Sequence, residues 1–125
     1  NMFLSDEGLV KLSGYGLGEH LNPLYSEKST AWCMGPEVFS EQIEMKSDVW
    51  SLGISLIELA EGRNPFEGCS PWDVRYRVCE GDSPSLCSEE WSTTFVDFVS
   101  KCLVKDVEER WSVSELMEVS SLSEE

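Results

Sequence analysis

Three closely spaced glycines, Gly14, Gly16 and Gly18, form a G-x-G-x-G run near the start of the chain. Backbone N–H groups in such a run can surround a phosphate, but a phosphate loop also needs the N-terminus of a helix directly behind it. The residues from His20 to Pro23 do not begin a convincing helix. We therefore interpret the run as a source of backbone freedom rather than as a phosphate-binding site.

Histidine and cysteine offer no clearer site. His20 is the only histidine, and no nucleophile or metal-ligand cluster accompanies it, so we expect a loop residue rather than a catalytic base. The five cysteines are odd in number and form no C-x-x-C pair. Their usage predicts a reduced, cytoplasmic chain with cysteines at positions 33, 69, 79, 87 and 102.

The chain is strongly acidic, with 24 Asp and Glu against 9 Lys and Arg and a formal net charge of -15 over 125 residues. A surface of that sign repels nucleic-acid phosphates and anionic lipids. The most apolar segment, residues 49–60, is too short to span a membrane and contains Glu58. We expect neither nucleic acid nor a membrane as a partner. An apolar content of 41% is ordinary for one globular domain or part of one.

The elements that would position these residues begin with two short apolar stretches, residues 2–4 and 9–12, joined by a polar, Gly-containing turn. This pattern predicts a β-hairpin. Residues 13–39 carry scattered glycines and prolines without a helical period, which predicts one long loop.

Four helices are expected after the loop. The first begins at Asp48 as its N-cap and stops at Gly62. Its apolar residues lie on all sides, which predicts a buried helix at the centre of the core. The second has a capping box at residues 70–73 and ends near Gly81, and the third starts at Ser92 with one apolar face. Ser112 and Glu115 cap the last helix.

Three motifs at the junctions of these elements narrow the possibilities. Residues 34–37 read Met-Gly-Pro-Glu, residues 47–53 read Ser-Asp-Val-Trp-Ser-Leu-Gly, and residues 101–106 read Lys-Cys-Leu-Val-Lys-Asp and precede Arg110. In this order and spacing they resemble protein kinase subdomains. The resemblance covers residues 1–122, with 123–125 as a tail. It implies a mainly α fold: a fragment of the larger, C-terminal lobe of a kinase, with a small hairpin, an activation segment and about four helices.

Within the kinases, residues 29–37 resemble the G-T-P-Y-W-M-A-P-E stretch of the Ste20-like kinases, and residues 52–60 and 83–86 are similar to MAP kinase kinases. The resemblance therefore implies an STE-type kinase, with the choice between the two left open. Thr30 stands where Ser/Thr kinases carry a threonine that supports the catalytic loop, which favours Ser/Thr over Tyr specificity.

The resemblance implies ATP and Mg²⁺ as the family's cofactors, because phosphoryl transfer depends on positioning ATP and neutralising its phosphates. Asn1 matches one of the family's metal ligands. The other, the Asp of a D-F-G motif, is replaced, since the motif reads Gly14-Tyr15-Gly16 here. Glycine offers no carboxylate, so metal-dependent nucleotide binding is doubtful. Glu19 or Asp6 is nearby in sequence and could substitute, although neither lies at the expected position.

Other family positions concern structure and regulation. Glu37 and Arg110 match an ion pair that ties the loop to the late helices, and Asp48 matches an acidic residue that holds the catalytic loop. Because the family partners of Asp48 would lie before Asn1, we expect an under-satisfied carboxylate here. Residues 26, 29 and 30 are Ser, Ser and Thr and could be phosphorylated, but no arginine cluster is present to receive the charge.

Trp72, Tyr76, Arg75 and Arg77 cluster in the segment from residue 71 to residue 80. Their types suit a docking surface for a protein, but packing of the aromatic rings in the core explains them equally well.

These observations lead to three hypotheses about the function. The first is a pseudokinase that acts as an allosteric partner or scaffold in signalling. The second is an ATP-dependent Ser/Thr protein kinase whose catalytic and ATP-binding residues lie upstream, and the third is a non-functional fragment. A chain that begins with Asn1 rather than Met suggests truncation upstream, which would remove the smaller kinase lobe. The expected partners are that lobe and other proteins, as partners or substrates.

Overall fold

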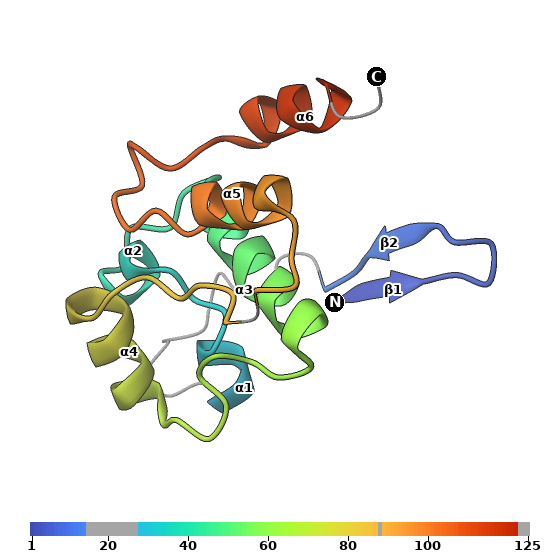
Figure 1. Ribbon diagram of the computed structural model, residues 1–125. Helices are drawn as coiled ribbons and strands as arrows, with labels where there is room; N and C mark the ends of the chain where they lie inside the picture. The colour runs from blue at the N-terminus through green and yellow to red at the C-terminus, as the bar shows by residue number, and fades with distance from the viewer. Residues whose placement is uncertain (15–27, 88, 123–125) are drawn as a thin grey trace.

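The computed structural model describes residues 1–14, 28–87 and 89–122. A small β-hairpin stands to one side of a helical body (Figure 1). Strands β1 (Met2–Leu4) and β2 (Val10–Leu12) are antiparallel, with Met2 opposite Leu12 and Leu4 opposite Val10. The turn between them closes through a 2.9 Å hydrogen bond from the Ser5 backbone N–H to the Leu9 carbonyl. The hairpin and the mainly helical fold predicted from the sequence are confirmed.

Helix α3 (Ser47–Glu61) runs through the middle of the body (Figure 1). It ends as predicted at Gly62, whose φ of 74° is the left-handed conformation that glycine adopts without a Cβ clash. Its start differs from the prediction, because Lys46 is the N-cap and Asp48 lies inside the first turn. The Ser47 hydroxyl accepts a 3.0 Å hydrogen bond from the Glu44 backbone N–H, which holds the segment before the helix.

Helix α3 is buried on one side rather than all round, contrary to the sequence-based expectation. Trp50, Ile54 and Ile57 are buried, whereas Leu59 is 74% exposed. At Gly53 a Cβ atom would lie 2.7 Å from Leu103 Cδ2, so the absence of a side chain lets the residues at the end of α5 approach α3 closely.

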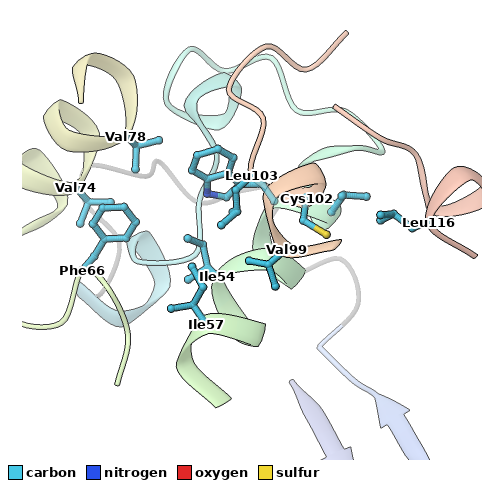
Figure 2. Close-up of a cluster of buried hydrophobic side chains, with 11 residues drawn as sticks. Ile54, Ile57, Phe66, Val74, Val78, Val99, Cys102, Leu103 and Leu116 are labelled. Carbon is cyan, nitrogen blue, oxygen red and sulfur yellow. The ribbon is translucent and has the colours of Figure 1, made fainter. Parts of the chain in front are cut away.

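The remaining long helices are α4 (Pro71–Glu80), α5 (Thr93–Cys102) and α6 (Val113–Leu122). Ser70 and Asp73 form the predicted capping box of α4, Ser92 caps α5, and Ser112 with Glu115 caps α6. Figure 2 shows their side chains meeting those of α3 in one cluster of buried hydrophobic residues: Val49, Trp50, Ile54, Ile57, Phe66, Val74, Val78, Val99, Cys102, Leu103 and Leu116.

The predicted long loop between the hairpin and α3 contains two helices of four residues each, α1 (Lys28–Ala31) and α2 (Pro36–Phe39). Both contact α4. Pro36 at the first helical position and the extended Gly35 before it set the start of α2. One turn is too short to show a helical period in the sequence, so the prediction of a loop was wrong at these positions. Within the ranges described, none of the helices is both long and apolar enough to cross a membrane.

Candidate functional site

The structure places Asn1 next to Gly14 at the open end of the hairpin. The Ser13 backbone N–H donates a 2.9 Å hydrogen bond to the Asn1 carbonyl, which extends the pairing of the two strands by one residue. A Cβ atom on Gly14 would lie 2.8 Å from Asn1 Oδ1. A side chain at position 14 would therefore point at the Asn1 amide. Tyr15 and Gly16 lie outside the described residues, as do Glu19, His20 and Ser26.

A buried ion pair joins Glu37 of α2 to Arg110 in the connection between α5 and α6. Two parallel hydrogen bonds link the side chains, with Arg110 Nη1 2.7 Å from Glu37 Oε1 and Nη2 2.9 Å from Oε2. The Arg110 side chain is fully buried and that of Glu37 is 5% exposed. This two-pronged geometry suits the planar guanidinium and fixes the relative orientation of the two segments.

Arg110 is also tied to the backbone on both sides. Its Nε donates to the Val104 carbonyl at 2.8 Å, and Nη1 donates to the Lys46 carbonyl at 2.9 Å. The guanidinium carbon lies 5.2 Å from the centroid of the Trp50 ring, a distance at which a cation and an aromatic face attract. One side chain therefore joins α2, the start of α3 and the loop after α5.

Residues 1–121 match the protein-family model described as "Protein kinase domain". The chain belongs to the protein kinase domain family. Among curated proteins it is 41% identical over 123 residues to "Serine/threonine-protein kinase dst1" of Dictyostelium discoideum, an alignment that covers 94% of this chain and 17% of the relative. It is 40% identical over 121 residues to "Serine/threonine-protein kinase TAO3" of Gallus gallus, covering 94% of this chain and 14% of the relative.

A third relative, "Serine/threonine-protein kinase hippo" of Drosophila melanogaster, is 36% identical over 124 residues, which cover 94% of this chain and 18% of the relative. The predicted Ser/Thr kinase family is thus confirmed, and of the two STE-type branches the relatives support the Ste20-like one. The chain spans only 13% to 24% of the length of such relatives. Kinases of this family use ATP and Mg²⁺ and act on protein substrates.

The described residues of this kinase domain do not fit Mg²⁺. A hard cation of this size needs near-octahedral oxygen ligands, with at least one carboxylate beside the nucleotide phosphates. Among the residues that the structure describes, the position opposite the Asn1 amide oxygen is a glycine, which supplies no side-chain ligand. Asp6 lies in the turn at the far end of the hairpin, so it does not replace the absent carboxylate. Across the described ranges no group of three or more His, Cys, Asp or Glu side chains gathers to hold a metal ion.

Glu37 remains ionised in its buried position. Burial by itself would raise the pKa of this carboxyl, but the hydrogen bonds from Arg110 and from backbone, together with the Arg110 charge, outweigh it. The pKa therefore lies below the ordinary glutamate range. The ion pair is charged at neutral pH and holds the kinase domain's α2 segment in place.

Asp48 does not show the expected under-satisfied carboxylate. Its side chain is exposed on the first turn of α3, where water can solvate it and where a negative charge favours the positive end of the helix dipole. The expectation assumed a buried residue. In the structure the carboxylate is available at the surface near the helix start.

The segment before α2 is held by two contacts that the sequence did not reveal. Trp32 Nε1 donates a 3.0 Å hydrogen bond to the Cys69 carbonyl, just before α4. The Ser51 hydroxyl on α3 donates a 2.8 Å hydrogen bond to the Cys33 carbonyl. Thr30, the predicted support of the catalytic loop, lies in α1 and is exposed. Only a tryptophan within a polar loop hinted at such an anchor, since indole N–H groups usually find an acceptor.

Proposed function

We propose that this chain is part of a pseudokinase: a Ser/Thr kinase fold that acts as an allosteric partner or scaffold and has lost metal-dependent phosphoryl transfer. One observation carries the proposal. A Cβ atom at position 14 would lie 2.8 Å from Asn1 Oδ1, but the residue there is Gly14, so the position that the resemblance matches to the family's second metal ligand has no carboxylate. A neutral amide alone does not compete with water for Mg²⁺.

The retained structural contacts support the same proposal. The Glu37–Arg110 pair keeps good two-pronged geometry although its burial costs desolvation energy that only a complete pair repays. A domain that drifted without function would not be expected to keep both partners in place. The fold is therefore maintained although phosphoryl transfer is impaired. A maintained fold can still bind a partner or transmit an allosteric change.

The expected size of the impairment follows from the electrostatics of catalysis. Removing one preorganised group that stabilises transition-state charge typically costs about 3 to 4 kcal/mol, a factor of about 10² to 10³ in rate. A metal ligand beside the transferred phosphate belongs to the most sensitive of such groups.

The direct test uses the full-length gene product and measures its melting temperature with ATP, with and without MgCl₂, alongside phosphate transfer to a generic protein substrate. We expect no magnesium-dependent rise in melting temperature and no transfer. Robust transfer that Asn1→Ala abolishes would instead establish an active Ser/Thr kinase with a rearranged metal site.

Restoring the carboxylate gives a sharper measurement. Gly14→Asp places an acidic group against the Asn1 amide, and Asp tolerates the left-handed φ of 78° at this position better than most residues. We expect Gly14→Asp to raise the affinity for Mn²⁺ or Mg²⁺, measured by calorimetry. Gly14→Asn is the matched control, because it has the same shape without the charge. Equal metal affinity in both variants would show that position 14 does not face a metal site.

A further inference from the structure

One face of α4 points away from the core and carries a hollow of about 310 Å³. Its lining residues are spaced three and four positions apart, so they form one outward stripe along the helix: Trp72, Arg75, Tyr76, Cys79 and Glu80. The opposite face buries Val74 and Val78 in the core. The stripe is therefore not the side by which α4 is held in the fold.

Two aromatic rings dominate this outward stripe. Trp72 is 56% exposed and Tyr76 is 71% exposed. The structure therefore decides between the two sequence-based interpretations of these residues, since neither ring packs in the core. Trp, Tyr and Arg are the residue types that contribute most often to the energetic centres of protein interfaces, and Trp72, Arg75 and Tyr76 occupy consecutive places on the stripe.

The helix that carries the stripe is held at both ends. At its start the Asp73 backbone N–H donates to Ser70 Oγ at 3.2 Å, and the Ser70 N–H donates to Asp73 Oδ2 at 3.1 Å. At its end Lys105 Nζ donates to the carbonyls of Cys79 at 2.8 Å and Gly81 at 2.6 Å. A partner would meet a preorganised surface, which lowers the entropy cost of binding.

The two arginines of α4 differ in their contacts. Arg77 turns towards the fold: its guanidinium lies 5.3 Å from the Phe66 ring centroid and Nη1 donates to Cys69 Sγ at 3.2 Å. Arg75 is exposed at the hollow, and within the described ranges no hydrogen bond or ion pair engages its guanidinium. Glu80 is also exposed, five positions further along the stripe.

We propose that the outward stripe of α4 binds a segment of a partner protein that presents a large apolar side chain between a carboxylate and a cation. The apolar side chain packs on the rings of Trp72 and Tyr76, and the carboxylate pairs with Arg75. The cation pairs with Glu80, about 7 to 8 Å along the helix axis from Arg75. Its charge also suits a chain of net charge -15, which attracts cationic partners. The inference does not depend on the loss of catalysis proposed above.

The test selects short random peptides displayed on phage against the immobilised full-length gene product. Enriched peptides are synthesised, and their dissociation constants are measured by fluorescence anisotropy. We expect them to share an apolar residue flanked by one acidic and one basic residue. Trp72→Ala and Tyr76→Ala should each weaken binding about tenfold or more. Leu59→Ala, at a side chain that is 74% exposed on α3, is the matched control and should leave binding unchanged.

A charge exchange separates a binding role of Arg75 from a structural one. Arg75→Glu should weaken the selected peptides about tenfold, and replacing the peptide carboxylate by lysine should restore binding to the variant but not to the natural protein. The proposal is overturned if no peptide is enriched, or if enriched peptides bind the variant that combines Trp72→Ala and Tyr76→Ala as well as the natural protein. It is also overturned if sedimentation shows a dimer that Tyr76→Ala dissociates, because a second copy would then cover the stripe.

Discussion

The buried pair between Glu37 and Arg110 offers the sharpest test of the fold. Glu37→Gln keeps the volume of the side chain and removes its charge. The Arg110 side chain is fully buried, so the substitution leaves a buried guanidinium without its counter-charge. An amide oxygen can still accept one hydrogen bond, but the amide NH₂ group faces another donor.

Breaking a buried pair by changing one partner typically costs about 3 to 5 kcal/mol. Glu37→Gln should fall at the lower end, about 3 kcal/mol, because the carbonyls of Val104 and Lys46 still accept from the guanidinium at 2.8 and 2.9 Å. Arg110→Met should cost more, about 5 kcal/mol. That variant leaves the Glu37 carboxylate buried and also removes the Arg110 donor from the Val104 carbonyl, at about 1 to 3 kcal/mol for an unsatisfied group. The Lys46 carbonyl still accepts from the backbone N–H groups of Val49 and Trp50.

Urea unfolding followed by circular dichroism measures these differences. The matched control is Glu67→Gln, since Glu67 forms an exposed ion pair with Arg63 at 3.5 Å. We expect less than about 0.5 kcal/mol there. A double variant that combines Glu37→Leu with Arg110→Met leaves neither buried charge. Its loss of stability should be about 2 kcal/mol smaller than the sum of the losses measured for Glu37→Leu alone and Arg110→Met alone.

The pair also predicts a pH dependence. The pKa of Glu37 is lower in the folded chain than in the unfolded one, so its stabilising effect is complete above the ordinary glutamate range and is lost as the pH falls through the lowered value. The difference in stability between the natural protein and Glu37→Gln should therefore shrink in acid. A cost below about 1 kcal/mol at neutral pH, or a difference that does not change on acidification, would refute the account of a buried charged pair.

Two further changes probe the packing around α3. Gly53→Ala should destabilise the domain by about 1 to 3 kcal/mol in urea although alanine favours helices, because its Cβ would lie 2.7 Å from Leu103 Cδ2; a gain in stability would contradict the close approach. Burial raises the pKa of Cys102 to about 11, so a thiol reagent should modify the exposed Cys87 first and leave Cys102 unmodified until urea unfolds the chain. Mass spectrometry of the labelled peptides checks the order, and equal labelling of both thiols in the folded chain would be inconsistent with it.

The sequence predicted the elements whose signals are local. The capping boxes at Ser70 and Ser112, the apolar face of α5 and the Gly62 stop each arise from neighbouring residues, and the structure has them at the predicted places. The hairpin was predicted for the same reason, since short apolar stretches and the polar turn between them are short-range features. The motifs at the junctions between these elements then indicated the protein kinase family.

Features that depend on distant contacts were missed. Helices α1 and α2 are single turns that contact α4, so no period in their own sequence marks them. Asp48 looked like an N-cap because its type favours that position, but the N-cap is Lys46, two residues earlier, and the helix begins at Ser47. Burial of α3 was overestimated because its exposed Leu59 is apolar like its buried neighbours, and composition alone does not distinguish them.

The candidate site was predictable in its residues but not in its geometry. Spacing and family resemblance singled out Glu37 and Arg110, whereas the carbonyl acceptors around the guanidinium depend on the backbone path of residues far apart in sequence. The approach of Gly14 to Asn1 likewise needed the register of the hairpin. Exposure of the outward stripe of α4 needed the packing of the whole helix.

The Glu37–Arg110 pair also has a consequence for the order of folding, because its two side chains are 73 residues apart in sequence. Closing a loop of that length lowers the chain entropy more than forming a local helix or the hairpin does. The pair should therefore form after the folding transition state, and its removal should speed unfolding while leaving the folding rate nearly unchanged. The pair would then form late in folding, and its main kinetic effect would be to slow the unfolding of the domain.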